Sequence, residues 1–427
     1  MTLLSRLVSG ALQRILPLGL LGMAVGLACW PLNLLDRAQD QLLQRLPAYG
    51  THWTVPALLM ALAPLVVMPM LLWLQAGPWS DGAGSGIPQT MAVVQDPARG
   101  ETLLSPRPTL RRLVLWSLAS LALFPLGREG PVVQVGAAVT QALRRRWPRL
   151  LQSLPPSDLV AVAGAAGLAG GFNTPLMGVV FLAEELTGRF SAGLIWPALL
   201  VCVSAAGISN LGGQGEFALG LLRQMPPEPL QLLWAVPLGI GAGLLGGLFA
   251  RLIVAATARI TPLARRRPLG TGLLLGLSLA GLLLLSGGGS GGDGELLMQQ
   301  LVETPQQLHE PWLQLPVRLI APALALGASV PGGLIDPALS LGAVLGQLLT
   351  APSGLGALGI ALGMAAALAG ATQLPVMSLT FVLRLAGDQQ FLPGVLLAAV
   401  LGAYSGRLLL SKPVYHVLAD LLAERSP

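Results

Sequence analysis

The sequence predicts an all-α protein that crosses a membrane several times. Only 10% of its 427 residues are charged, where a soluble globular domain has about a quarter, and 53% are hydrophobic. Apolar stretches recur along the whole chain and are bounded by glycine and proline. This composition excludes a soluble cytosolic enzyme and a small secreted module. Cys29 and Cys202 lie in apolar runs, so neither a disulfide framework nor a zinc site is expected.

The N-terminal region is predicted to be a helix that enters the membrane. Apolar residues at helical spacing over residues 3–15 run directly into the apolar stretch 16–35. No small-residue cleavage site ends a short apolar core, so a cleaved signal peptide is not expected. Residues 53–74 and 230–256 are each long enough to cross a hydrocarbon core of about 30 Å.

The remaining apolar segments are shorter and are interrupted by proline or glycine. They cover residues 110–126, 131–143, 159–171, 175–186, 337–349, 355–368 and 375–385. Most are too short to span a bilayer alone. Irregular backbone is tolerated in a bilayer only where it is buried in protein or lines a wet cavity. Each break is therefore either part of a permeation pathway or a kink that serves helix packing.

The two halves of the chain are similar to each other. The sequence GREGP at 127–131 is followed by a Gly-Ala pair five residues after its proline, and GLIDP at 333–337 is followed by the same pair at the same spacing. PLM at 175–177 corresponds in the same way to PVM at 375–377. The two offsets, 206 and 200 residues, are nearly equal, which indicates an internal duplication.

Transporters with such repeats bind their substrate near the membrane midplane, where paired broken helices meet. We therefore expect two inverted membrane repeats, residues 1–225 and 226–427, and no soluble domain. Arginine clusters at 144–149 and 259–267 are expected to face the cytoplasm, as are both termini. These arginines flank apolar segments without interleaved aromatic residues, so nucleic acid is not an expected partner. The glycine-rich stretch 287–294 is expected to be a flexible solvent loop.

Residues 84–88, of sequence GSGIP, form the first candidate anion site. Glycines let the backbone approach a ligand, and Pro88 pre-sets the first turn of a helix whose free N–H groups face Ser85. The Ser85 hydroxyl adds a donor without a charge, so an anion would be held without being trapped. A plain capped turn has the same sequence, and this motif alone does not decide between the two.

The second break, GREGP, places Glu129 at a helix N-terminus in apolar sequence. An ionisable residue inside a membrane indicates a function. This carboxylate could occupy the place of an anion and leave when it is protonated. The alternative is a simple ion pair with Arg128, which is disfavoured because adjacent residues point apart on a helix.

Two further elements complete the candidate site. The third break, GGLIDP at 332–337, supplies backbone N–H groups from the second half of the chain. Glu184 and Glu185 end the apolar segment that begins at Pro175, and consecutive residues point in different directions. One of the two is expected to face solvent or a salt bridge, and the other to face the interior and take up protons.

In this order and spacing, these stretches resemble the CLC family of chloride channels and chloride/proton antiporters over nearly the whole chain. GSGIP and GREGP are intact, and GLIDP stands at the family's GxFxP motif. The stretch from Phe172 to Glu185 resembles the helix before the family's internal glutamate, and KPVY, ending at Tyr415, resembles the stretch whose tyrosine faces the ion. The resemblance implies the CLC-type inverted repeat of broken and tilted helices.

The resemblance also implies roles for single residues. It assigns chloride binding to the hydroxyls of Ser85 and Tyr415, to the amides of Leu334 and Ile335 for a central site, and to the amides around Arg128 and Gly130 for an outer site. Glu129 is similar to the gating glutamate, which competes with chloride and carries the proton. Glu185 is similar to the internal proton glutamate of the exchangers.

Two residues depart from the family pattern in the third motif. Ile335 stands where an aromatic residue is usual, and it keeps the amide but not the aromatic wall. Asp336 stands where a small residue is usual. Its charge could slow chloride, alter coupling, or point toward a basic partner, and the sequence does not decide among these.

The resemblance thus implies a homodimer that exchanges chloride for protons across a lipid bilayer, the bacterial inner membrane, with no cofactor and no metal. The C-terminal regulatory domain of larger members is not expected.

A passive chloride channel is the main alternative, although such members usually lack an acid at the position of Glu185. A fluoride/proton exchanger is the second, although its members have altered GSGIP and GREGP stretches. An intramembrane protease would need a base beside Ser85, and the three histidines stand in polar or segment-end contexts, so an enzyme is not expected.

Overall fold

The computed structural model describes residues 3–47, 52–149, 151–211, 228–303, 311–386 and 391–423. Within these residues every regular element is a helix, apart from one isolated antiparallel bridge between Gly127 and Gly333. The predicted all-α fold class is confirmed.

The described chain divides into two compact units, and each is built from three separate stretches of the sequence. The first comprises Met1–Leu34, Gly86–Leu110 and Glu129–Glu216, and the second comprises Leu35–Ser85, Arg111–Arg128 and Phe217–Pro427. Two helices continue from one unit into the other: α1 (Leu3–Leu43) and α6 (Pro106–Leu121). The other helices of the first unit are α4 (Ile87–Gln95), α5 (Gly100–Leu103), α7 (Glu129–Arg146), α8 (Pro156–Phe172), α9 (Pro175–Phe181) with a π-helical turn (Leu182–Leu186), and α10 (Ala192–Asn210).

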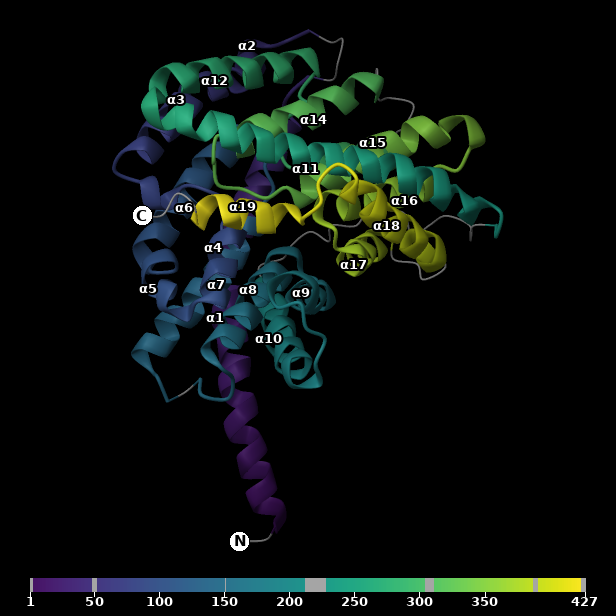
Figure 1. Ribbon diagram of the computed structural model, residues 1–427. Helices are drawn as coiled ribbons and strands as arrows, with labels where there is room; N and C mark the ends of the chain where they lie inside the picture. The colour runs from purple at the N-terminus through teal and green to yellow at the C-terminus, as the bar shows by residue number, and fades with distance from the viewer. Residues whose placement is uncertain are drawn as a thin grey trace. The chain divides into compact units, whose positions relative to one another are not determined.

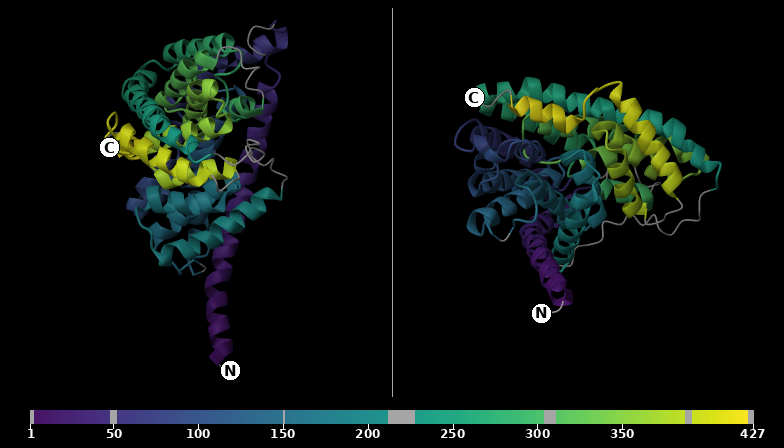
Figure 2. Two further views of the ribbon diagram at one scale, coloured as in Figure 1. Left: turned by 90° about the vertical axis from the view of Figure 1, so that its right-hand side faces the viewer. Right: turned by 60° about the horizontal axis from the view of Figure 1, so that its bottom comes forward.

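The second unit contains the larger number of helices (Figure 1). Besides its parts of α1 and α6, they are α2 (Val55–Ala61), α3 (Ala63–Ala76), α11 (Ala235–Arg266), α12 (Pro268–Leu285), α13 (Glu295–Glu303), α14 (Pro311–Gly327), α15 (Ile335–Thr350), α16 (Ala357–Thr372), α17 (Pro375–Ala386), α18 (Leu392–Arg407) and α19 (Val414–Ala423). Helices α11, α16 and α18 pack against one another, and they stay side by side in the views of Figure 2.

Five described helical segments are long and apolar enough to cross a membrane. They are Ile15–Leu43, Val55–Ala76, Ala192–Asn210, Gln231–Arg266 and Pro268–Leu285. Both spans predicted at full length are among them. Leu273, Leu274 and Leu277 on α12 are each more than half exposed, which suits a helix face in contact with lipid rather than water.

Helices α7 and α8 approach each other so closely that only glycine fits between them. A Cβ atom at Gly136 would lie 2.0 Å from the Ala163 carbonyl oxygen, and one at Gly167 would lie 2.1 Å from the Val132 carbonyl oxygen. Without a strong hydrophobic force between helices in lipid, such close packing by small residues is a main source of helix association.

The same contact recurs between α15 and α16. A Cβ atom at Gly342 would lie 2.3 Å from the Gly363 carbonyl oxygen, and one at Gly363 would lie 2.3 Å from the Gly342 carbonyl oxygen. Gly342 is 206 residues after Gly136, and Gly363 is 200 residues after Ala163, the two offsets of the sequence repeat. The two helix pairs therefore pack at corresponding positions.

Backbone conformation repeats at the same offsets. Four residues other than glycine have a positive φ in the described chain: Leu123 (61°), Asn173 (49°), Ser329 (58°) and Gln373 (62°). They form two pairs, separated by 206 and 200 residues. In each half of the chain, these residues lie at the end of a helix, shortly before a motif. The repeat boundaries themselves, 1–225 and 226–427, stay a prediction.

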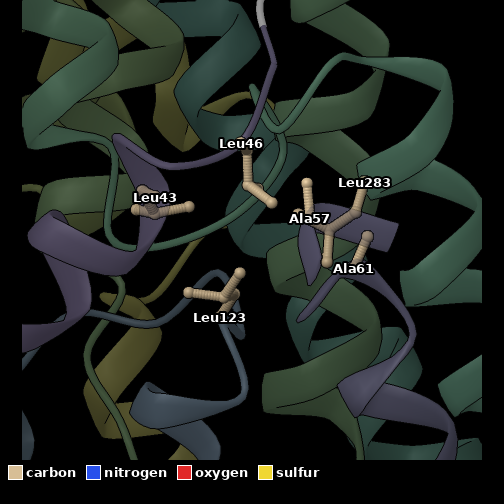
Figure 3. Close-up of a cluster of buried hydrophobic side chains, with 6 residues drawn as sticks. All are labelled: Leu43, Leu46, Ala57, Ala61, Leu123 and Leu283. Carbon is tan, nitrogen blue, oxygen red and sulfur yellow. The ribbon is translucent and has the colours of Figure 1, made fainter. Parts of the chain in front are cut away.

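A hydrophobic cluster in the second unit holds the C-terminal end of α1. Leu43 and Leu46 pack against Ala57 and Ala61 of α2, with Leu123 and Leu283 completing the cluster (Figure 3). This contact fixes the last turns of α1, which carry the acidic side chains described below.

The close approach at Gly136 predicts a specific loss of stability. Gly136→Ala forces a methyl group into the α8 backbone and should cost about 1–3 kcal/mol, seen as a lower thermal unfolding midpoint of the purified protein in detergent. Gly207→Ala on α10 is the control, because nothing lies within 4 Å of its added Cβ and alanine favours a helix by about 1 kcal/mol over glycine. An unchanged midpoint in Gly136→Ala would show that α7 and α8 are not in this contact.

Candidate functional site

The loop before Ser85 is held by a buried arginine. Arg112, which is 2% exposed, donates from Nε to the Gly84 carbonyl oxygen (3.0 Å) and from Nη2 to the carbonyl oxygens of Ala83 (2.8 Å) and Asp81 (3.0 Å). The Gly84 N–H donates to the Ser329 carbonyl oxygen at 2.8 Å. The loop is therefore fixed from both sides, and its position does not depend on the serine.

The Ser85 hydroxyl remains available as a donor. Its oxygen is buried, and it has no hydrogen-bond partner among the described residues. A buried hydroxyl without a partner is costly, and a bound anion would satisfy it. This observation fits the predicted role of Ser85.

The first and second motifs meet at two glycines of the first unit. Gly86 has φ of 114°, and its N–H donates to Gln89 Oε1 at 2.8 Å. A Cβ atom there would lie 2.4 Å from the Gly130 carbonyl oxygen, so both conformation and space require glycine. Helix α4 begins at Ile87 with a proline in its first turn, as the sequence predicts.

The second and third motifs are joined by backbone hydrogen bonds in the second unit. The Gly127 N–H donates to the Gly333 carbonyl oxygen at 3.1 Å, and the Gly333 N–H donates to the Gly127 carbonyl oxygen at 2.8 Å. Trp116 Nε1 also donates a hydrogen bond to the Gly127 carbonyl oxygen, at 3.3 Å. These bonds satisfy the backbone groups of Gly127 and Gly333 at the two breaks.

Helix N-termini follow both motifs directly. Helix α7 begins at Glu129, which is fully buried, and α15 begins at Ile335 with Leu334 as its N-cap residue. The first amides of a helix have no acceptor inside the helix, and the helix dipole favours negative charge there. Asp336 is buried in the first turn of α15, where its carboxylate gains the same stabilisation.

Two other predicted residues lie in the same units as these motifs. Tyr415 is fully buried in the first turn of α19, in the second unit together with Ser85, Leu334 and Ile335. Glu185 is buried in the π-helical turn after α9, in the first unit together with Glu129.

The paired glutamates differ in burial. Glu185 is 3% exposed, whereas Glu184 is partly exposed. The expectation that the two point in different directions agrees with this difference. The anion-binding and proton-transfer roles stay predictions.

An acidic cluster in the second unit was not predicted from the sequence. Asp36 near the end of α1 forms an ion pair with Arg128, and both side chains are buried. One carboxylate oxygen each of Asp36, Asp293 and Glu295 lies within 4.8 Å of the others. Arg128, whose backbone belongs to the GREGP motif, therefore points its charge at this cluster. The sequence feature that indicates this cluster is Asp36, a charged residue in a largely apolar helix.

The glycine-rich stretch before α13 is not the expected solvent loop. Gly291, Gly292 and Asp293 are buried, and Arg318 donates to the carbonyl oxygens of Gly291 (2.8 Å) and Gly292 (2.9 Å). Asp293 Oδ1 accepts a hydrogen bond from the Glu295 N–H at 2.9 Å. The glycines provide positive φ, 63° at Gly292, rather than flexibility.

Burial and the neighbouring Asp293 raise the pKa of Glu295 from 4.5 to about 8, against the opposing charges of Arg128 and Arg384. The folded protein therefore keeps a proton on Glu295 that the unfolded chain releases. Since the proton is bound in the folded state between about pH 4.5 and 8, stability falls as pH rises through this window.

The buried ion pair predicts a large effect of one substitution. Asp36→Asn removes the charge that pairs with the buried Arg128 and should cost about 3–5 kcal/mol in thermal unfolding. Asp81→Asn is the matched control, since it removes the partner of Arg111 in a more exposed pair of 2.8 Å and should cost about 0–1 kcal/mol. Equal losses of stability in the two variants would contradict a buried ion pair between Asp36 and Arg128.

The raised pKa predicts a pH dependence. The unfolding midpoint of the wild-type protein should fall between about pH 4.5 and 8, and Glu295→Gln should flatten this fall. Glu303→Gln, at the exposed end of the same helix, should leave the profile as it is. A profile of Glu295→Gln that matches the wild type would assign the proton to another group.

Comparison with known proteins identifies the family of this chain. Residues 63–407 match the voltage gated chloride channel family. The chain is 29% identical over 315 residues to the voltage-gated ClC-type chloride channel ClcB of Escherichia coli O17:K52:H18 (strain UMN026 / ExPEC), covering 70% of this chain and 74% of that protein. It is 27% identical over 362 residues to the H(+)/Cl(-) exchange transporter ClcA of Vibrio parahaemolyticus serotype O3:K6 (strain RIMD 2210633), covering 79% and 74%.

The fold matches a solved structure over almost its full length. The crystal structure of a slow cyanobacterial Cl-/H+ antiporter superposes with a TM-score of 0.76 at 25% identity, covering 97% of this chain and 99% of that chain. The resemblance inferred from the motifs is confirmed. The chain therefore belongs to the voltage gated chloride channel family, the CLC family, and is an integral membrane protein for anion transport rather than an enzyme.

Proposed function

We propose that the protein exchanges chloride for protons. The observation that carries this proposal is the presence of two buried carboxylates, Glu129 in an anion motif and Glu185 away from these motifs. A pathway for anions alone has no need of the second. Both carboxylates are buried in a membrane protein, where a buried ionisable group is costly and indicates a function.

In this proposal a central chloride is bound only by neutral donors. They are the hydroxyls of Ser85 and Tyr415 and the amides of Leu334 and Ile335, all in the second unit. A hydrogen bond to a charged group contributes about 1.5–3 kcal/mol, so four such bonds replace much of the lost hydration. Because no cation takes part in the central site, the ion can leave again.

The outer site is formed by the amides around Arg128 and Gly130 in our proposal. The Glu129 carboxylate lies at the N-terminus of α7, where the helix dipole that attracts chloride also stabilises the carboxylate. Carboxylate and chloride therefore compete for one place. Protonation removes the charge of Glu129 and frees the place for the anion.

A passive chloride channel is the second candidate, favoured by the similarity to ClcB. It would use the same anion sites and Glu129 as a gate, and it would leave Glu185 without a transport role. The similarity to ClcA and to the cyanobacterial antiporter favours exchange instead.

We further propose a homodimer with one pathway per subunit in a bacterial inner membrane, with both termini in the cytoplasm. The arginines at 144–149 and 259–267 support this orientation by the positive-inside tendency.

The exchanger predicts uphill proton movement driven by a chloride gradient across reconstituted vesicles, followed with a proton-sensitive electrode. Glu129→Gln should abolish proton transport and make anion flux insensitive to pH, because it mimics the protonated gate. Glu185→Gln should abolish proton transport and leave an anion flux that Glu129 still gates.

Glu184→Gln is the matched control for the second substitution, and it should keep coupled transport. Chloride flux without proton movement in the wild type would contradict the exchanger and support the passive channel. Loss of coupling in Glu184→Gln, with coupling retained in Glu185→Gln, would shift the internal acid by one residue.

A further inference from the structure

An apolar pocket lies in the first unit between α1 and the C-terminal end of α7 with the segment that follows it. Its volume is about 740 Å3, within the range of about 300–1,000 Å3 that is typical of sites for small molecules. Leu20, Leu21 and Ala24 line it from α1, and Leu143 and Leu151 line it from the other side. The pocket is thus large enough for a chain-like apolar group.

The rim of this pocket is basic. Arg146 and Arg149 line the pocket and are exposed, and Trp147 lies between them in sequence. The Arg146 guanidinium lies over the Trp147 ring at 5.5 Å from its centre, which orients the charge and keeps it near the pocket. The described lining contains these two arginines and no acidic residue.

We propose that this pocket binds an anionic phospholipid, with an acyl chain in the apolar part and the phosphate on Arg146 and Arg149. Arginine matches phosphate geometry with paired donors, and tryptophan is favoured at the level of the headgroups. The cytoplasmic leaflet carries anionic lipid, and basic pockets beside membrane helices on that side recognise such headgroups. The site rests on the proposed cytoplasmic orientation of this segment and not on exchange of protons.

Other occupants fit the pocket less well. A zwitterionic lipid would fill the apolar part but would leave the two arginines without a net counter-charge. A second copy of this chain, packed symmetrically on this face, would bring the same arginines of both copies together, and like charges at an interface disfavour association.

The test measures lipid retained by the purified full-length protein. The protein in detergent is titrated with phosphatidylglycerol and, separately, with phosphatidylcholine of the same acyl chains, and bound lipid is counted by native mass spectrometry. We expect phosphatidylglycerol to bind at least about tenfold more tightly, and Arg146→Gln with Arg149→Gln to remove this preference. The matched control is Arg144→Gln with Arg145→Gln, which removes the same charge from residues that do not line the pocket, and it should change binding by less than about twofold.

A second variant tests the apolar part. Ala24→Trp fills the pocket and should weaken binding of phosphatidylglycerol, while free glycerol phosphate should not compete with the lipid in the wild type. Equal affinity for both lipids, equal loss in both arginine pairs, or full competition by glycerol phosphate would overturn the proposal. Separation of a dimer by Ala24→Trp would assign the pocket to a second copy. If Ala24→Trp does not fold, the arginine pairs still decide.

Discussion

The backbone hydrogen bonds between Gly127 and Gly333 are the constraint on which the candidate site depends. A helix that breaks inside apolar surroundings leaves N–H and C=O groups that lipid cannot satisfy, and each costs several kcal/mol. Here two breaks from the two halves of the chain satisfy each other, at 3.1 and 2.8 Å. Helices α7 and α15 begin directly after these breaks, and in our proposal their first amides bind the anion.

Charged side chains secure the segments around these breaks. Arg112 binds three carbonyl oxygens before Ser85, and Arg318 binds two before Asp293. Each arginine donates hydrogen bonds to backbone carbonyl oxygens that no helix satisfies, since its planar group offers several donors in fixed directions. Arg128 does the same with an acid, Asp36, and so links α1 to the segment that leads into α7. The anion motifs are therefore held by residues that lie outside them.

Local patterns in the sequence predict much of this architecture. The helix starts at Ile87, Glu129 and Ile335 follow from proline and glycine positions, and the helix pairs follow from the repeat. The motifs also identify the family. The contacts of Arg112, Arg318 and Asp36 could not be predicted, because they join residues that are far apart in the chain. The glycine-rich stretch 287–294 illustrates the reason: its composition is that of a solvent loop, and its burial depends on an arginine supplied by α14.

The π-helical turn at Leu182–Leu186 has a consequence for how the buried acid at this end of α9 can change. A π-turn holds one residue more than an α-turn, so the residues after it are rotated by about 100° relative to an uninterrupted helix. Glu184 and Glu185 lie inside this turn, so their directions depend on the number of residues that precede them in it. Gain of a single residue before Glu184 would move this acid to the buried place that Glu185 has now, without any substitution. A change in the length of this segment, as well as a point change, can therefore determine which acid is buried at this end of α9.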